Sequence, residues 1–229
     1  MPLKRAGAQR GSGTGLLEAL RQPRAMLGML RQYATANFGR SREPVGSRDA
    51  LRGFLESRAS FVAQTSLFGY LRTRAGMRYP ELFDDDAFVA SINAAKWQLW
   101  LACLSDLAVY AGGLLRGRAG ASPAQVGALM GRLVDEILEV TGVPPDAGEH
   151  FVSQAQAVRA RIAMCDWAAV SDDDQPFSQS PDALVRWAPV IDELKQLDAP
   201  IVRNSVRFRW QEVRRHLRRS LDAQAILAP

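Results

Sequence analysis

Residues 84–115 read DDDAFVASINAAKWQLWLACLSDLAVYAGGLL and predict the helix around which the fold is built. It opens with three aspartates, which suit a helix N-terminus because carboxylates interact favourably with the positive end of the helix dipole. Its tryptophans and leucines then fall on nearly every side of a helical wheel. A helix that is apolar all round is a buried one. We therefore predict that residues 84–115 form the central helix of a bundle.

The most apolar part of this stretch has the length of a membrane span. Trp97 to Leu115 is a largely apolar run between Lys96 and Arg116. Asp106 lies near its middle, where a carboxylate would cost about 2.5–3.5 kcal/mol at the centre of a bilayer. We therefore expect a core helix and not an integral membrane segment.

Helical signals continue on both sides, and alternation of the kind that predicts strands is almost absent. Capping residues such as Ser47, Ser122 before Pro123, and Asp146 with Glu149 mark helix starts, and Gly142 marks an end. We predict an all-α fold: one bundle of about seven helices within residues 16–229, preceded by a flexible basic arm over residues 1–15. Besides 84–115, the expected helices are about 16–38, 47–76, 122–142, 146–170, a helix from 180 that is interrupted near 189, and a last helix from Pro200 through about 201–227.

The charge is unevenly distributed along the chain. Residues 1–60 carry eleven Lys and Arg against four Asp and Glu, residues 61–202 eleven against eighteen, and residues 203–229 seven against two. Basic ends around an acidic middle suggest an anionic partner for the ends. The alternative is that the basic ends pair with the acidic middle of the same chain, and the sequence leaves both interpretations open.

Motifs for catalysis are missing. The sequence has no G-x-S-x-G, no Walker A, no G-x-G-x-x-G before a helix and no H-E-x-x-H, and it has only two histidines. Cys103 and Cys165 form no C-x-x-C pair, which suits a reducing compartment. No apolar run follows Lys4 and Arg5, so we expect no secretory signal and a cytoplasmic protein. We predict no catalytic residue, no metal site and no cofactor, although the sequence does not decide whether the chain is an enzyme.

The C-terminal helix is the best-formed amphipathic segment. An apolar stripe along it should dock on the core, with arginines on its borders; the stripe consists of Val202, Val206, Trp210, Val213, Leu217 and Leu221. A basic ridge of this kind can bind phosphate groups or an acidic protein. Aromatic residues are not interleaved with the arginines and no helix-turn-helix is evident, which argues against nucleic acid. The predicted contacts with an anionic membrane surface or an acidic partner are Arg207, Arg214, Arg215, Arg218 and Arg219.

Asp106 suggests the alternative function. A carboxylate among apolar neighbours must be paired, hydrogen-bonded or protonated. It could be an acid with a raised pKa in a ligand pocket, with Lys96, Trp97, Trp100 and Tyr110 around it. It could equally form a structural ion pair with an arginine of another helix, such as Arg58 or Arg72.

A resemblance covers about a quarter of the chain. Residues 51–112, from LRGFLESRASFVAQ to LSDLAVYAG, are similar to a group of uncharacterised helical proteins of α-proteobacteria, some of which are labelled esterases. The resemblance implies a bacterial protein of the cytoplasm or the inner membrane surface, and an atypical hydrolase as the alternative to an interaction protein. Any family site would be sought among the polar residues of this stretch: Gln64, Arg72, Arg74, Tyr79, Lys96 and Asp106.

Overall fold

The predicted central helix is α4, Asp86–Ala119, in a computed structural model that describes residues 44–228. Asp85 is its N-cap, and the carboxylate of Asp85 accepts hydrogen bonds from the backbone N–H groups of Ala87 and Phe88. The helix ends at Gly120, whose φ of 66° places it in the left-handed region that favours glycine. Side chains on all sides of α4 are buried, as expected for a core helix.

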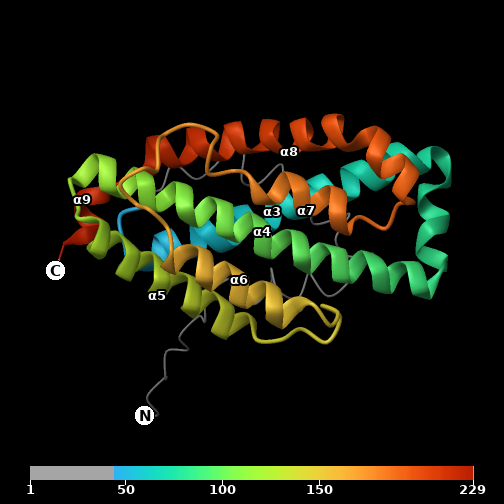
Figure 1. Cartoon of the computed structure of the whole chain (residues 1–229), viewed down its shortest axis with the longest axis horizontal. Helices are drawn as coiled ribbons and strands as arrows, with labels where there is room; N and C mark the ends of the chain where they lie inside the picture. The colour runs from blue at the N-terminus through green and yellow to red at the C-terminus, as the bar shows by residue number, and fades with distance from the viewer. Residues whose placement is uncertain (1–43, 229) are drawn as a thin grey trace, which may run out of the picture. The chain divides into compact units, whose positions relative to one another are not determined.

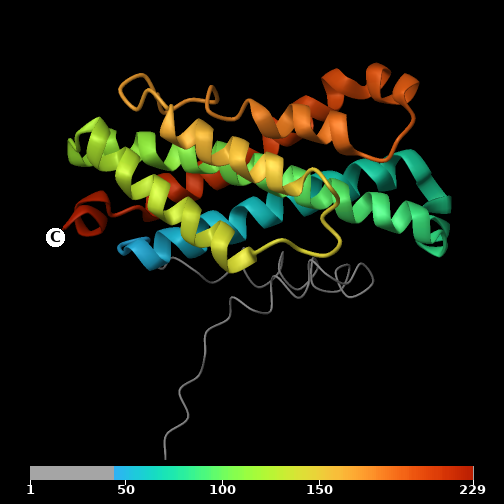
Figure 2. The same cartoon turned by 60° about the horizontal axis from the view of Figure 1, so that its bottom comes forward.

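Other helices surround α4 (Figure 1). α3 (Arg48–Ala75), α5 (Pro123–Thr141), α6 (Phe151–Ala163), α7 (Gln179–Trp187) and α9 (Ala223–Leu227) all pack against it, and η1 (Gly76–Asp84) joins α3 to α4. α8 (Asp192–Ser220) packs on α7 and α3. α5 and α6 lie side by side, and α8 lies on the opposite side of α4 from them (Figure 2).

The all-α prediction is confirmed for residues 44–228. These residues form seven α-helices, and their β-structure is limited to one isolated bridge between Val45 and Leu221. α4 is long and apolar enough to cross a membrane, but 89% of its most apolar window is buried inside the bundle. The arm predicted over residues 1–15 and the helix predicted over 16–38 lie outside the described residues.

The predicted capping box at Asp146 is wrong. Helix α6 begins at Phe151, and its N-cap is His150, which makes no side-chain capping bond. The carboxylate of Asp146 instead accepts hydrogen bonds from Trp97 Nε1 at 2.8 Å and from Lys96 Nζ at 3.4 Å. Since Lys96 is 1% exposed, its ammonium group needs this partner, and the partner fixes the loop after α5 to the core.

α6 also ends earlier than predicted, at Ala163 instead of near Val170. After α6 the chain turns, and the indole of Trp167 lies between two helical glycines, Gly112 of α4 and Gly127 of α5. A Cβ at Gly112 would lie 2.2 Å from Trp167 Cζ3, and one at Gly127 would lie 3.0 Å from Trp167 Nε1. The two glycines thus make the slot that holds Trp167, which is 5% exposed.

The last helix differs from its prediction at both ends. α8 begins at Asp192, so that Pro200 lies inside it, and it ends at Ser220 before the separate short helix α9. The turns before Pro200 are held by Asp198, whose carboxylate is bonded to Arg74 and accepts a hydrogen bond from the Tyr70 hydroxyl of α3. This contact between helices keeps the segment helical although proline removes a backbone donor.

Candidate anionic-surface interface

Helix α8 is fixed to the bundle by the apolar stripe that its sequence predicts. Val202, Val206, Trp210, Val213 and Leu217 are all at most 5% exposed. The indole Nε1 of Trp210 also donates a hydrogen bond to Ser180 Oγ of α7 at 2.9 Å. The stripe and this bond hold α8 in place on its neighbours.

Three of the five predicted contact arginines are exposed on this helix: Arg207, Arg215 and Arg219. Arg207 donates a hydrogen bond to Asn204 Oδ1 one turn earlier. Arg215 and Arg219 make no hydrogen bond or ion pair with any residue between 44 and 228. These three guanidinium groups are available to an external anion.

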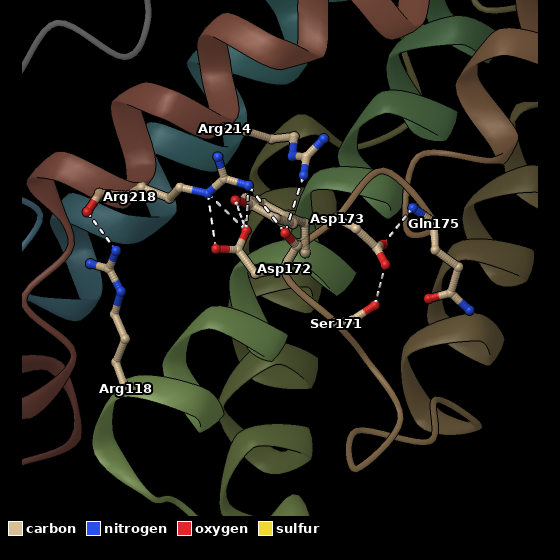
Figure 3. Close-up of polar contacts among 8 residues, drawn as sticks. Arg118, Ser171, Asp172, Asp173, Gln175, Arg214 and Arg218 are labelled. Carbon is tan, nitrogen blue, oxygen red and sulfur yellow. Dashed lines mark hydrogen bonds and ion pairs between the residues drawn. The ribbon is translucent and has the colours of Figure 1, made fainter.

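The other two predicted arginines are bound to Asp172 in the loop between α6 and α7 (Figure 3). Arg218 Nε lies 2.8 and 2.9 Å from the two carboxylate oxygens of Asp172, and Arg218 Nη2 donates to its backbone carbonyl. Arg214 Nη2 donates to the same carbonyl at 3.3 Å. Tyr110 completes this Asp172 cluster by donating from its hydroxyl to Asp172 Oδ1 at 2.6 Å.

The Asp172 cluster shifts the pKa values of its members. Burial raises the pKa of Asp172, but hydrogen bonds from Arg218 and Tyr110 and the charges of the two arginines outweigh burial and leave the pKa below its usual value. Burial, and then the hydrogen bond to Asp172, raises the pKa of Tyr110 to about 12. At neutral pH the cluster therefore consists of an ionised carboxylate, two guanidinium groups and a neutral phenol.

The end of α8 is capped by an arginine from α4. Arg118 Nη2 donates to the carbonyl of Arg218 at 2.6 Å, and Arg118 Nη1 donates to the carbonyl of Leu221 at 3.2 Å (Figure 3 shows the first of these bonds). Carbonyls at a helix C-terminus have no partner within the helix, and a cation there is favourable. The basic end of α8 is thus held at two points, by Asp172 and by Arg118.

We expect Asp172→Asn to destabilise the protein by about 0.5–1 kcal/mol, because the ion pair is partly exposed. A carboxylate with a depressed folded-state pKa stabilises the fold above its unfolded pKa of about 4, and this contribution is lost as pH falls through the folded value. The difference between wild type and variant in urea unfolding should therefore shrink below about pH 4. Asp174→Asn, at an exposed neighbour, serves as the control. An Asp172→Asn effect that does not change with pH would contradict this assignment.

Asp106 lies at the centre of a second, fully buried cluster. Its carboxylate accepts hydrogen bonds from four groups: Arg161 Nη1 at 2.6 Å, Gln179 N at 3.1 Å, Ser180 N at 2.7 Å and Ser180 Oγ at 2.6 Å. Burial raises the pKa of Asp106 above its usual value, and the charge of Arg161 and the bonds from Ser180 offset only part of the rise. All four groups are donors, so the cluster suits the ionised carboxylate.

This cluster has a structural role. The two backbone donors belong to the first turn of α7, whose own N-cap, Ser178, makes no side-chain capping bond. Asp106 therefore caps α7 from α4, which satisfies N–H groups that a helix cannot satisfy itself. Its arginine partner is Arg161 of α6, and neither Arg58 nor Arg72, which the sequence suggested, takes that place.

Three of the four residues predicted to surround Asp106 in a pocket bond to other carboxylates. Lys96 and Trp97 contact Asp146, and Tyr110 contacts Asp172. Trp100 packs edge-on against Trp97, with ring centroids 5.7 Å apart. A groove of about 620 Å³ between α4, α6 and α7 is lined neither by Asp106 nor by any of these four residues; its lining includes Gln98, Leu101, Gln154, Val158, Asp182 and Trp187. Among residues 44–228, no group of three His, Cys, Asp or Glu side chains is arranged to hold a metal ion.

Sequence reasoning missed three exposed apolar side chains on α8. Leu197, Ile201 and Phe208 are 72%, 74% and 71% exposed. The prediction began this helix at Pro200, which left Leu197 outside it. Phe208 could have been found, because it lies opposite the predicted buried stripe on a helical wheel.

The comparisons with known proteins add no relative. No protein-family model matches the sequence, and no curated protein and no solved structure is similar enough to count as a match. The resemblance of residues 51–112 to helical bacterial proteins therefore stays an expectation.

Proposed function

We propose that this chain is a non-enzymatic helical interaction protein whose helix α8 binds an anionic membrane surface from the cytoplasmic side. The observation that carries the proposal is the exposure of Arg207, Arg215 and Arg219 on one rigid helix. Arg215 and Arg219 have no partner among the described residues. Arginine near an anionic bilayer contributes about 1 kcal/mol of binding free energy for each residue.

The bundle supports this function by holding helix α8, which carries the exposed arginines, in a fixed position. The buried stripe of α8, the bond from Trp210 to Ser180 and the Asp172 cluster hold the helix on its neighbours. The exposed arginines lie outside all three contacts. Their removal should therefore change binding without changing the fold.

The test is co-sedimentation with vesicles across a salt series. A triple variant, Arg207→Gln with Arg215→Gln and Arg219→Gln, should bind vesicles containing phosphatidylserine roughly 100-fold more weakly than wild type at low salt. Wild-type binding should weaken as salt rises, and vesicles of phosphatidylcholine alone should bind poorly. The thermal unfolding midpoint should stay unchanged.

A second triple variant controls for net charge. Arg78→Gln, Arg132→Gln and Arg159→Gln remove the same charge from η1, α5 and α6. These residues are exposed, and α5 and α6 lie across α4 from α8 (Figure 1). Equal weakening by both triples, or equal binding of wild type to charged and neutral vesicles, would contradict the proposal. Failure of the wild type to bind charged vesicles would rule out the bilayer and point to an acidic protein on the same arginines.

A further inference from the structure

The exposed apolar residues and two of the exposed arginines lie on one line along α8. Leu197, Ile201, Phe208, Arg215 and Arg219 follow each other at intervals of four, seven, seven and four residues. Residues at these intervals share one face of an α-helix. We name these five residues the outer line of α8. Its first part carries three large apolar side chains, with exposed Asn204 between Ile201 and Phe208, and its second part is basic.

Within the part of the chain that the structure describes, no neighbour covers the apolar part of the outer line. α8 already buries a complete apolar stripe on its opposite side, from Val202 to Leu217. Leu197, Ile201 and Phe208 remain more than 70% exposed, although single exposed apolar residues are normal and clustered ones are not. Three large side chains in line on one helix indicate a contact surface.

The outer line matches the two layers of a bilayer surface, because its apolar side chains suit the region below the headgroups and its arginines suit the phosphates. Leucine, isoleucine and phenylalanine are the side chains that amphipathic helices insert below lipid headgroups, and arginine extends towards the phosphates. From Ile201 to Arg219, after the proline at position 200, α8 presents both kinds of side chain on one face, as a flat surface requires. Glu212 is exposed one turn after Phe208, and its negative charge offsets part of the positive charge of the arginines. Because the remaining positive charge is limited, the apolar side chains have to contribute to binding as well.

We infer that Leu197, Ile201 and Phe208 insert into the interface of an anionic bilayer while Arg207, Arg215 and Arg219 contact its headgroups. The inference rests on the proposed function and adds the depth and orientation of the contact. α8 lies parallel to the membrane, with the outer line towards the lipid and the buried stripe towards the bundle. Binding then has a part that salt screens and a part that salt does not screen.

The two parts are separated by a triple variant, Leu197→Gln with Ile201→Gln and Phe208→Gln. With vesicles of phosphatidylserine and phosphatidylcholine, we expect it to lose the binding that persists at high salt, by at least about tenfold. Val140→Gln, Val143→Gln and Val152→Gln remove three other exposed apolar side chains near α5 and α6, and this control should bind as wild type does. If the α8 triple binds as tightly as wild type at every salt concentration, the inference is wrong and the contact is purely electrostatic.

A fluorescent label locates the contact directly. Phe208→Cys is labelled with an environment-sensitive fluorophore in a Cys165→Ser background; Cys103, the other cysteine, is fully buried. Brominated lipids should quench a label at residue 208 and leave one at Val140→Cys unquenched. Quenching at residue 140 alone would overturn the orientation while leaving vesicle binding intact. Failure of the wild-type protein to bind any vesicle would instead overturn the proposed function itself.

Discussion

Replacement of Asp106 by alanine is expected to destabilise the protein by about 3 kcal/mol, since removing one partner of a buried ion pair leaves the other uncompensated. Asp106 is fully buried and accepts bonds from Arg161, Gln179 and Ser180. Alanine also removes the cap of α7. We place the effect at the lower end of the range because Arg161 is 20% exposed and can reach water. Urea unfolding measures the loss directly.

Two further variants identify the source of this effect. Asp182→Ala removes an exposed carboxylate of α7 that pairs with Arg203, and it should cost less than about 1 kcal/mol. Asp106→Leu combined with Arg161→Met removes both charges, so it should recover the ion-pair part of the loss and not the capping part. A loss below 1 kcal/mol for Asp106→Ala would show that the cluster does not hold α7 in place.

Gly112→Ala is expected to destabilise the protein by about 2–3 kcal/mol, although alanine is the better helix former. The added Cβ would lie 2.2 Å from Cζ3 of Trp167 and 2.9 Å from two further ring atoms. Trp167 is buried between α4 and α5 and cannot move without opening that contact. The result is measured as a shift of the urea midpoint at constant slope.

Gly117→Ala is the matched control in the same helix. Nothing lies within 4 Å of a Cβ built at Gly117, so the substitution should stabilise the protein by about 0.5–1 kcal/mol through helix propensity alone. Opposite signs for two identical substitutions five residues apart would establish the slot for Trp167. The same sign for both would show that Trp167 packs elsewhere.

Local sequence signals predicted the helix boundaries well where residues close in the sequence determine the backbone conformation. Ser122 with Pro123 and Gly142 bound α5 as expected, because capping and backbone preferences act within a few residues. The helix starts that were predicted wrongly are those determined by contacts between residues far apart in the sequence. Asp146 is taken by Lys96 and Trp97, and the segment before Pro200 is held by Arg74 and Tyr70. The local sequence around these segments does not show any of these partners.

The candidate interface was also predictable only in part, because helical periodicity is a local signal and contacts with another loop are not. Periodicity identified the buried stripe of α8 and placed arginines beside it, but it could not show that Asp172 binds Arg214 and Arg218. The charge pattern left two outcomes open, an external anion or the acidic middle of the chain. Within residues 44–228, Arg218 pairs with that middle, and Arg215 and Arg219 do not.

The bridge between Val45 and Leu221 has a consequence for chain connectivity. Val45 N donates to the carbonyl of Ser220 at 2.7 Å, and Asp222 N donates to the carbonyl of Val45 at 3.0 Å. The residues that lead into α3 therefore lie directly against those that leave α8. Arg48 Nη2 also donates to the carbonyl of Ala228 at 3.3 Å, so a linker from Ala228 to Pro44 would close residues 44–228 into a ring that keeps α9, and the ring could be opened at the exposed turn around Gly120. A chain that visits the same helices in this permuted order is therefore expected to fold into the same bundle.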